Sequence, residues 1–378
     1  MFVIGGGPAG LAAAISARQQ GFRVAVADGA KPPIDKACGE ALMPDAIAAL
    51  ERLGVAVPVT EAFPVRGVRF LSSALSVQAD FPYGCCGLSI RRTALHRIMT
   101  ERATGLGVEL LWQSVVTGIS GGEVQLGDRT IRTQWIVGAD GANSRVRRWA
   151  NLDLQSRTDF RYAFRQHYRV APWTDRMEIY WGKDSQGYAT PVGNEEVCVA
   201  VASRNHRLRN RGLQNRGLQN RGLRLEESLP AFPELSARLR GTETASAERG
   251  SISANRKLKR VCRGNVALVG DASGTVDAIT GEGLGLAFSQ AVALADCFTS
   301  GNLAGYQAAH RRLALRPLLM ARLMLTLDGR PWFQQRTLQV FHKRPEVFRR
   351  LLALHVGTLS PFHFALDGLT LGWGLLTA

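Results

Sequence analysis

The sequence predicts a mixed α/β fold: a largely parallel sheet, an inserted antiparallel sheet and a C-terminal helical segment. Three observations favour this fold. Short apolar runs such as Phe2–Ile4 and Val266–Val269 end in glycine and lead toward helix-forming segments, as buried parallel strands do. Four strand-like segments follow one another between residues 160 and 202 without long helices between them. From Tyr306 onward the apolar pattern is helical.

The first apolar run leads into a glycine-rich turn, Gly5-Gly-Gly7-Pro8-Ala9-Gly10. A helix is expected from Leu11 to Gln20, and a second strand, Phe22–Ala27, ends in Asp28. A strand, a G-x-G-x-x-G turn, a helix, a strand and an acid in this order form the dinucleotide-binding fingerprint.

Each glycine of that fingerprint has a physical role. Gly5 permits the tight turn, Gly7 lets a pyrophosphate approach the backbone, and Gly10 allows close packing of helix on strand. Asp28 stands at the distance expected for hydrogen bonds to ribose hydroxyls. The N-terminal segment therefore predicts a site for a dinucleotide.

The segment from Lys31 to Pro44 is loop-like and contains Lys36 and Cys38. Cys38 fits two roles, a redox thiol or a small residue beside a ligand; no resolving cysteine lies nearby, which favours the second. A helix is expected from Asp45 to Leu53, and another from Thr93 to Thr104. Arg92, just before the latter, either binds a phosphate or ribityl group or is a solvated charge at a helix start.

Short strands are expected at Val108–Trp112, Val115–Ile119, Val124–Leu126 and Thr130–Val137. The last of them runs into a second glycine-and-aspartate corner, which contains Asp140, Gly141 and Arg145. We expect Asn143 or Ser144 to cap the helix that follows this corner.

The antiparallel segments are Phe160–Val170, Arg176–Trp181, Gly187–Pro191 and Val197–Ala202, and the β-rich stretch Val65–Phe81 is assigned to the same sheet. Polar and aromatic residues alternate along them, and the candidates to face a ligand are Arg165, His167, Tyr180 and Tyr188. Each of these is also compatible with an ordinary polar core or surface position.

A tandem repeat of Asn-Arg-Gly-Leu-Gln occupies residues 210–223. Its period is too short and its apolar content too low for a solenoid, so we interpret it as a loop expansion, with a polybasic contact as the alternative. A helix is expected after it, from Leu225 to Leu239.

The third corner follows Val266–Val269 and consists of Gly270-Asp271 and the segment Gly281-Glu-Gly283-Leu284-Gly285. A carboxylate at the carboxyl end of a strand is a common ligand position in open α/β sheets. Glycines before the helix Leu286–Ala295 allow a flat ligand to lie on bare backbone, near unpaired N–H groups. The alternative is an ordinary strand–loop–helix connection.

The C-terminal helices carry apolar residues at Leu313–Leu325, Val340–Leu354 and Leu366–Ala378. These helices either pack on the core or present a hydrophobic lid or membrane-surface face. No apolar run is long enough for a transmembrane helix, and the apolar strand close behind Met1 leaves no room for a signal peptide, so we expect a cytoplasmic protein.

The chain of 378 residues has a net charge of +16. Such a charge suits nucleic acid, an anionic membrane surface or attraction of anionic cofactors. The arginines are spread along the chain without an aromatic-interleaved strip, so no nucleic-acid partner is expected. The six cysteines are scattered and the histidines lack ligand spacing, which predicts neither disulfides nor a metal site.

The three corners, in their order and context, resemble the single-component FAD enzymes of the p-hydroxybenzoate hydroxylase fold over about residues 1–310. The resemblance implies that Gly5, Gly7 and Gly10 hold the FAD pyrophosphate, Asp28 the adenosine ribose and Arg92 the ribityl-phosphate side. It also implies that Asp271 binds the ribityl or pyrophosphate group, that the Gly281–Gly285 backbone holds the flavin ring, and that Asp140 and Gly141 serve both FAD and nicotinamide.

Within that fold, Lys36-Ala-Cys38-Gly-Glu-Ala-Leu and Thr280-Gly-Glu-Gly are most similar to the geranylgeranyl-reductase-like branch. The Tyr-x-Trp-x-Phe-Pro motif of prenyl reductases reads Gly187-Tyr188-Ala-Thr-Pro191 here, without the Trp and the Phe, which favours hydroxylation. Only one dinucleotide fingerprint is present, so NAD(P)H, the expected reductant, has no Rossmann domain of its own.

The predicted organisation is an FAD-binding domain (1–60, 87–155 and 256–310), an antiparallel-sheet substrate domain (61–86 and 156–255) and a C-terminal helical segment (311–378). The predicted function is an FAD-dependent monooxygenase that hydroxylates an apolar, aromatic or polyketide-like small molecule. The alternatives are reduction of prenyl double bonds and modification of a partner peptide. A peripheral membrane contact is compatible with the sequence, which identifies neither the substrate nor the oligomeric state.

Overall fold

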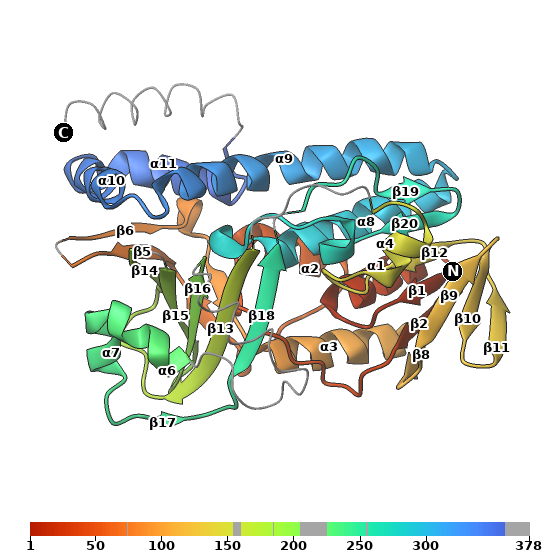
Figure 1. Cartoon of the computed structure of the whole chain (residues 1–378), viewed down its shortest axis with the longest axis horizontal. Helices are drawn as coiled ribbons and strands as arrows, with labels where there is room; N and C mark the ends of the chain where they lie inside the picture. The colour runs from red at the N-terminus through yellow and green to blue at the C-terminus, as the bar shows by residue number, and fades with distance from the viewer. Residues whose placement is uncertain (74, 154–159, 184, 205–224, 255, 360–378) are drawn as a thin grey trace.

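The computed structural model describes residues 1–378 except 74, 154–159, 184, 205–224, 255 and 360–378. The described residues form two large sheets, one toward each end of the long axis, with a long C-terminal helical layer above them (Figure 1). The tandem repeat at 210–223 and the apolar segment 366–378 lie outside the described residues.

The first large sheet has six strands in the order β19-β20-β12-β1-β2-β8. Its strands are β1 (Phe2–Ile4), β2 (Ala25–Asp28), β8 (Glu109–Trp112), β12 (Ile136–Gly138), β19 (Cys262–Arg263) and β20 (Val266–Leu268). All neighbours pair in parallel except β19 and β20, which form an antiparallel edge. The central pair β1–β12 places the carboxyl end of one beside that of the other, which brings two of the three predicted corners together.

Helices cover one face of this sheet and a small antiparallel sheet covers the other. The helical face is formed by α1 (Pro8–Gln19), α3 (Arg92–Gly105) and α8 (Gly283–Thr299), which pack on one another through side chains such as Leu11, Ile15 and Phe288. Strand β1 alternates accordingly: Val3 belongs to the helix-side core, while Phe2 and Ile4 pack on the opposite side.

The opposite face is covered by β9 (Val116–Ser120), β10 (Glu123–Leu126) and β11 (Arg129–Arg132). The prediction of one strand from Thr130 to Val137 is wrong, because the chain leaves β11 and turns before it enters β12. The turn is held by hydrogen bonds from Thr133 N to Gly122 O and from Thr133 Oγ1 to Trp135 O.

The second large sheet follows the order β17-β13-β16-β15-β14-β5-β6, and β18 also pairs with β13. Its strands are β5 (Gly67–Leu71), β6 (Ser76–Asp80), β13 (Phe160–Arg169), β14 (Met177–Trp181), β15 (Ser185–Gly193), β16 (Glu196–Ser203), β17 (Glu243–Thr244) and β18 (Arg249–Ala254). The four successive strands β13 to β16 pair antiparallel, as predicted, and β14 and β5 pair in parallel.

One face of this sheet packs on α6 (Leu225–Ser228) and α7 (Pro233–Arg238). The prediction of one helix from Leu225 to Leu239 is wrong: a short 3₁₀ turn, Leu229–Ala231, separates the two helices. Pro230 and Pro233 cannot donate the backbone hydrogen bonds of a continuous helix, which explains the break.

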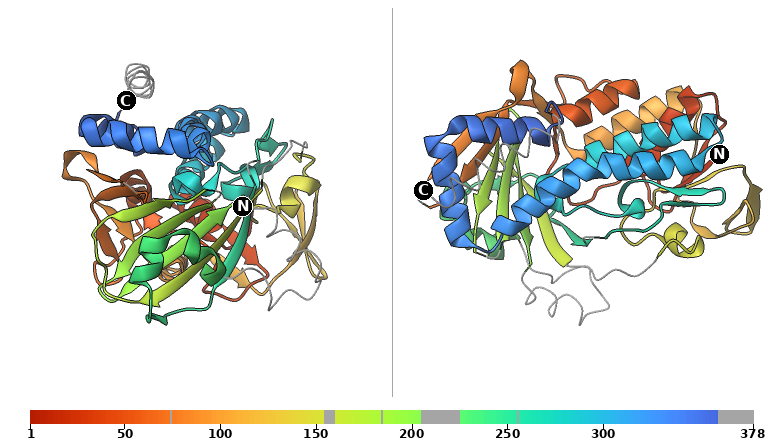
Figure 2. Two further views of the ribbon diagram at one scale, coloured as in Figure 1. Left: turned by 60° about the vertical axis from the view of Figure 1, so that its left-hand side comes forward. Right: turned by 90° about the horizontal axis from the view of Figure 1, so that it is seen from above.

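The C-terminal layer consists of α9 (Leu303–Leu327), α10 (Pro331–Lys343) and α11 (Pro345–His355). Seen from above, α9 lies along α8 and continues toward the second sheet (Figure 2). Helices α10 and α11 pack on β6 through Leu338, Phe341, Phe348 and other buried side chains, so the core-packing interpretation is confirmed for them. Among the described residues, no helix combines the length and apolarity needed to cross a membrane.

Two small elements complete the link between the sheets. Helix α2 (Pro44–Arg52) packs on α8, and the three-stranded sheet β3-β7-β4 joins it to β15. Its strands are β3 (Ala41–Leu42), β4 (Phe63–Val65) and β7 (Gly87–Ser89). This link brings the loop before β3 against the second sheet.

A buried ion cluster fixes α9 to the second sheet. Arg161, on β13, donates hydrogen bonds to Asp277 (2.8 Å) and to Asp328 (2.6 Å), at the end of α9. The three side chains are 2%, 6% and 3% exposed, so neither carboxylate is solvated.

We predict that Arg161→Met lowers the free energy of unfolding by about 3–5 kcal/mol, because it leaves the buried Asp277 without its cation and Asp328 with Arg204 alone. Arg132→Met is the control: Arg132 is 87% exposed beside Glu123, and its loss is expected to cost less than about 1 kcal/mol. Urea denaturation of both variants measures the difference. Equal losses of unfolding free energy in the two variants would contradict the role of Arg161 in a stabilising buried ion cluster.

Candidate cofactor and active site

The first glycine corner is shaped for close approach of backbone to backbone. Gly5 has a φ of +111°, and a Cβ there would lie 2.4 Å from the carbonyl oxygen of Ala139. A Cβ on Gly10 would lie 1.8 Å from the carbonyl oxygen of Gly5. A Cβ on Gly7, by contrast, would meet no chain atom within 4 Å. The chain itself therefore explains Gly5 and Gly10, whereas Gly7 leaves open space at the start of α1.

Two side chains hold this turn from behind. Asp28 accepts hydrogen bonds from Gly6 N (2.7 Å) and Ala30 N (2.8 Å). The buried His96 ring places Nε2 2.9 Å from the carbonyl oxygen of Gly6, and burial lowers the pKa of His96, which favours the neutral ring as the donor. Sequence reasoning missed His96, because only the fold brings α3 under the turn.

The third corner is fixed by buried amide and imidazole groups. Gly270 N donates to Gln290 Oε1 (2.9 Å), and His310 Nε2 lies 2.8 Å from Ser273 Oγ. Burial lowers the pKa of His310 to about 4, so its ring is neutral near pH 7. Asp271 projects from this corner and pairs with Lys36 at 2.9 Å, which joins two of the predicted cofactor residues across the site.

The predicted start of the last helix needs a correction. Helix α8 begins at Gly283, so Gly283, Leu284 and Gly285 form its first turn and do not precede it. A Cβ on Gly285 would lie 3.1 Å from the Cβ of Ala46, so this glycine permits close packing of α8 on α2. Gly281, with a φ of +70°, and Gly283 are exposed, so the backbone of this helix start is accessible, as holding a flat ring requires.

At the second corner, the side chains cap α4 (Arg145–Trp149). Asp140 Oδ2 accepts hydrogen bonds from Arg145 N (2.6 Å) and Val146 N (3.1 Å), and Ser144 Oγ accepts one from Arg147 N (2.9 Å). The cap predicted at Asn143 or Ser144 is thus Ser144. Asp140 Oδ1 is buried without a hydrogen bond from the described residues, and Gly141 has a φ of +79°.

The groups around these corners fit FAD. Arg92 Nε, like Asp140 Oδ1, is buried without a hydrogen-bond partner among the described residues. A guanidinium at the start of α3, open space at Gly7 and accessible N–H groups at the start of α8 match the phosphates and the electron-rich ring edge of that cofactor. Gly5, Gly7, Gly10, Asp28, Arg92, Asp271 and the Gly281–Gly285 backbone are the residues that would hold it.

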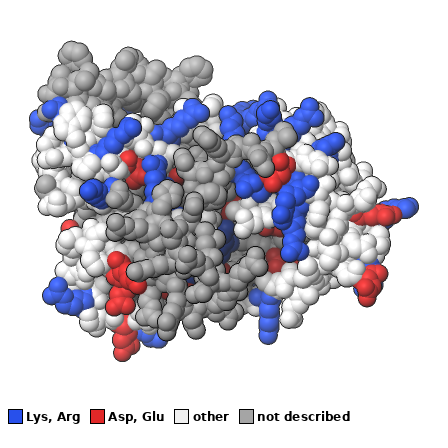
Figure 3. Space-filling model, in the orientation of Figure 1, with Lys and Arg blue, Asp and Glu red and all other residues white. Residues whose placement is uncertain are grey.

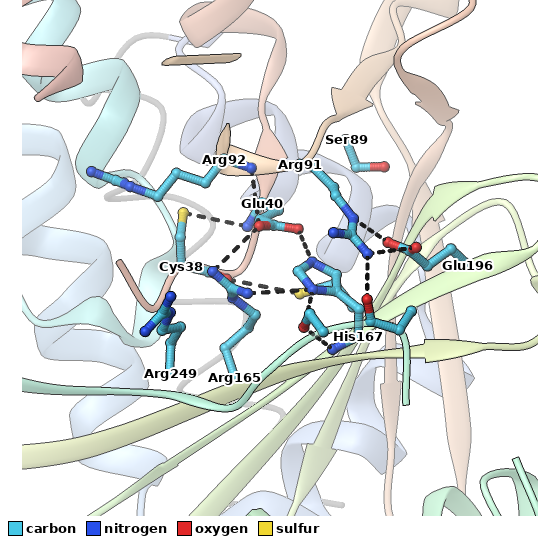
Figure 4. Close-up of polar contacts among 12 residues, drawn as sticks. Cys38, Glu40, Ser89, Arg91, Arg92, Arg165, His167, Glu196 and Arg249 are labelled. Atoms are coloured by element: carbon cyan, nitrogen blue, oxygen red, sulfur yellow. Dashed lines mark hydrogen bonds and ion pairs between the residues drawn. The ribbon is translucent and has the colours of Figure 1, made fainter. Parts of the chain in front are cut away.

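A buried polar cluster lies between the loop before β3 and the second sheet (Figure 4). Arg165 and His167 project from β13 toward Glu40, which is 2% exposed and has a φ of +61°. Glu40 Oε2 lies 2.6 Å from His167 Nε2, and Glu40 Oε1 accepts the hydrogen bond of Arg92 N at 3.0 Å. Glu40 therefore connects the start of α3 to the second sheet.

The cluster continues toward the surface on the other side of the imidazole. His167 Nδ1 lies 2.7 Å from Ser246 Oγ, and Ser246 is only partly buried. Arg165 forms an ion pair with Asp35 and lies 3.8 Å from Glu40. Because one imidazole nitrogen can accept a proton while the other donates one, Ser246, His167 and Glu40 form a path along which a proton can pass.

Strand register shows which predicted ligand-facing residues share a face. Arg165 and Tyr188 both stand opposite Ala200, so they lie in one row on the face that meets Glu40. Tyr188 does not join the cluster: its hydroxyl donates to Gln186 Oε1 (2.7 Å) and lies 3.3 Å from the carbonyl oxygen of Ile279, just before Gly281. Ile179 stands opposite Tyr188, so the next residue, Tyr180, lies on the other face of the sheet, against Phe232. The prediction that Tyr180 faces the ligand is therefore wrong.

The sulfur atoms beside the cluster are Cys38 and Cys198. Glu40 N lies 3.4 Å from Cys38 Sγ, and burial raises the pKa of Cys198 well above its ordinary value. Glu40, His167 and Cys198 place possible metal-ligand atoms within 4.8 Å of one another. The guanidinium of Arg165 lies 3.3 Å from His167 Nδ1 and would repel a metal cation there.

In addition to His96, sequence reasoning missed Glu40, Asp35 and Ser246. Glu40 follows Cys38 by two residues in the predicted loop, but its partners Arg92 and His167 lie 52 and 127 residues away. The sequence shows a carboxylate in the predicted ligand loop. It does not show that this carboxylate is buried, because the burial depends on tertiary contacts.

Comparison with known proteins agrees with this geometry. A family model described as FAD binding domain matches residues 1–301. The menaquinone reductase of Mycolicibacterium smegmatis is 29% identical over 89% of this chain and 86% of that protein. A probable 2-heptyl-3-hydroxy-4(1H)-quinolone synthase of Rhodococcus erythropolis is 28% identical over 79% of each protein. A flavoprotein/dehydrogenase structure from Cytophaga hutchinsonii matches with a TM-score of 0.80 and 19% identity, covering 94% of this chain and 92% of that chain.

We predict that Gly7→Ala weakens FAD binding at least about tenfold while the apoprotein keeps its stability. A methyl group at Gly7 meets no chain atom, so only a ligand that approaches the turn can clash with it. Gly105→Ala, at the end of α3 and also free of contacts, is the matched control with unchanged FAD affinity. Flavin fluorescence titration and thermal unfolding measure the two quantities. Unchanged FAD affinity in Gly7→Ala would contradict the assignment of this turn.

Proposed function

The chain belongs to the FAD-binding domain family and is an FAD-dependent oxidoreductase; on that premise we propose that it is a monooxygenase. Its substrate would be an apolar, aromatic or polyketide-like small molecule with a phenolic or enolic hydroxyl. NAD(P)H, as the reductant, would be drawn from the cytoplasm. The observation that carries the proposal is the buried proton path from Glu40 through His167 to Ser246.

Hydroxylation of an electron-rich ring is favoured when its hydroxyl group loses a proton, because the resulting anion is the stronger carbon nucleophile. Glu40 is the end of the path nearest the predicted cofactor corners, since it accepts the hydrogen bond of Arg92 N. A proton taken by Glu40 can pass to His167 Nε2, while His167 Nδ1 releases one toward the partly exposed Ser246. Arg165 stabilises negative charge nearby.

When bound, FAD supplies electron transfer from NAD(P)H and activation of dioxygen. The overall reaction balances as substrate C–H, dioxygen, NAD(P)H and one proton giving C–OH, NAD(P)⁺ and water. The chain's contribution is to bind and orient both partners, to exclude water and to move the substrate proton. Tyr188, in the same row as Arg165 on the second sheet, reaches the third corner through the carbonyl oxygen of Ile279.

The names of the two relatives support a ring substrate. One is named for menaquinone and the other for a heptyl-substituted hydroxyquinolone. The second of these names describes a product that carries a ring hydroxyl group. An aromatic or quinoid ring with apolar substituents is therefore the substrate class that we propose.

The proposal predicts incorporation of one labelled oxygen atom into product when the FAD-loaded protein turns over under ¹⁸O₂. The probes are phenols and naphthols that carry alkyl chains, with NADH or NADPH as reductant, and mass spectrometry measures the label. Product formed without dioxygen, or product whose oxygen derives from water, would contradict hydroxylation.

We predict that His167→Gln lowers kcat by about 10²–10⁴-fold, because glutamine keeps a polar side chain but cannot relay a proton. FAD affinity and melting temperature are expected to stay close to those of the unmodified protein. The control is His342→Gln, an exposed histidine on α10, with unchanged kcat. A fall in FAD affinity that accounts for the lost activity would show that His167 acts only through the structure.

A second candidate function is reduction of a carbon–carbon double bond in an isoprenoid substrate. The menaquinone reductase relative, which matches 89% of this chain, favours it. This reaction adds a hydride and a proton, and the path through His167 can deliver a proton as well as remove one. Anaerobic turnover of menaquinone to a product that keeps two additional hydrogens after its ring is reoxidised to the quinone would select this function over hydroxylation.

A further inference from the structure

A groove lies on the side of the molecule formed by α9, the start of α8 and the edge strand β19. It encloses a cavity of about 1040 Å³. Its aliphatic lining includes the partly exposed Leu258, Leu286 and Leu318, and Leu315 on α9 is 52% exposed. An aliphatic surface of this kind suits hydrocarbon chains.

The groove is also strongly basic. Six cationic residues line it: Arg256, Lys257, Lys259, Arg260, Arg263 and Arg311. No Asp or Glu is among the described residues of its lining. Figure 3 shows Lys and Arg side chains gathered over the region that Figure 1 labels α9 and β19.

Most of these charges are not neutralised within the chain. Arg256 pairs with Asp153 at 2.7 Å, and Arg311 donates to the carbonyl oxygen of Lys259 at 3.3 Å. For Lys257, Lys259, Arg260 and Arg263, no ion pair with a described residue occurs, and all four are exposed. Four adjacent free cations repel one another, and that repulsion is relieved by a polyanionic partner.

The groove is separate from the predicted cofactor site. None of the residues assigned to FAD, including Lys36, Arg92 and Asp271, is among its described lining. Its inner wall is instead the back of the third corner, where Ser273, Gln290 and His310 hold Gly270. The cations are thus not explained by the cofactor.

We propose that this groove docks the protein on an anionic lipid bilayer, with Leu315 in the acyl region and the free cations at the headgroup phosphates. Charge complementarity and the aliphatic lining together identify this partner. A nucleic acid would use the cations but leave the leucines without a partner, and the described lining contains no Phe, Tyr or Trp on which bases could stack. An anionic bilayer offers acyl chains to the leucines and headgroup phosphates to the cations.

The test is co-sedimentation of the FAD-loaded protein with vesicles of phosphatidylcholine alone or with 30% phosphatidylglycerol. We expect binding to the anionic vesicles only, and weaker binding at higher salt. Each cation near the surface contributes about fivefold, so Lys257→Gln, Lys259→Gln, Arg260→Gln and Arg263→Gln combined should lower the partition coefficient by nearly three orders of magnitude, about 600-fold. Leu315→Ser should lower it severalfold.

The control lowers the net charge equally at four exposed cations elsewhere: Arg129→Gln, Arg148→Gln, Arg240→Gln and Lys343→Gln. It is expected to bind anionic vesicles within about twofold of the unmodified protein. Equal losses in the two quadruple variants, equal binding to neutral vesicles, or an unaffected Leu315→Ser variant would overturn the proposal. If the quadruple groove variant does not fold, Lys259→Gln and Arg263→Gln alone should each cost about fivefold.

Discussion

The buried carboxylate of Glu40 is the constraint on which the geometry between the two sheets depends. It is 2% exposed, yet it stands in a loop and adopts a φ of +61°. Its desolvation is offset by hydrogen bonds from Arg92 N and with His167, and by Arg165 at 3.8 Å. These partners come from the FAD-binding part of the chain on one side and from β13 on the other, so a single side chain fixes the distance between cofactor corners and ligand-facing strand. Because three partners from different segments share this one carboxylate, the arrangement is hard to shift and suits a site that must orient two reactants.

The first corner could be predicted from sequence because each of its requirements is local. Gly5, Gly7 and Gly10 are spaced by the geometry of one turn, and Asp28 follows at the end of the next strand, so the pattern along the chain is also the pattern in space. The alternation of Arg165 and His167 on one strand was likewise readable, because strand periodicity places them on one face. The helix predicted at Leu225–Leu239 is wrong although the sequence contains the reason: Pro230 and Pro233 interrupt the backbone hydrogen bonds of a continuous helix.

Other features could not be predicted because they depend on contacts between distant segments. His96 under Gly6, Gln290 behind Gly270 and Glu40 against His167 each join residues more than 15 positions apart. The sequence shows the residue types but gives no register between α3 and the first turn, or between the loop after β2 and β13. Asp140 follows β12, as the sequence predicts. Only the structure shows that one of its carboxylate oxygens accepts the hydrogen bonds that cap α4.

The excess of positive charge has two distinct physical explanations. Part of it is internal: Arg147, Arg161 and Arg165 are each 2% exposed or less, and all three are paired with carboxylates, so they offset buried charge and hold elements together. The groove beside β19 is different, because its four free cations stabilise nothing within the described chain and raise the electrostatic free energy of the folded state. An anionic partner relieves a cost of that kind. If the substrate is an apolar ring compound held in a bilayer, the same charges would also bring the protein to the phase in which that substrate is concentrated.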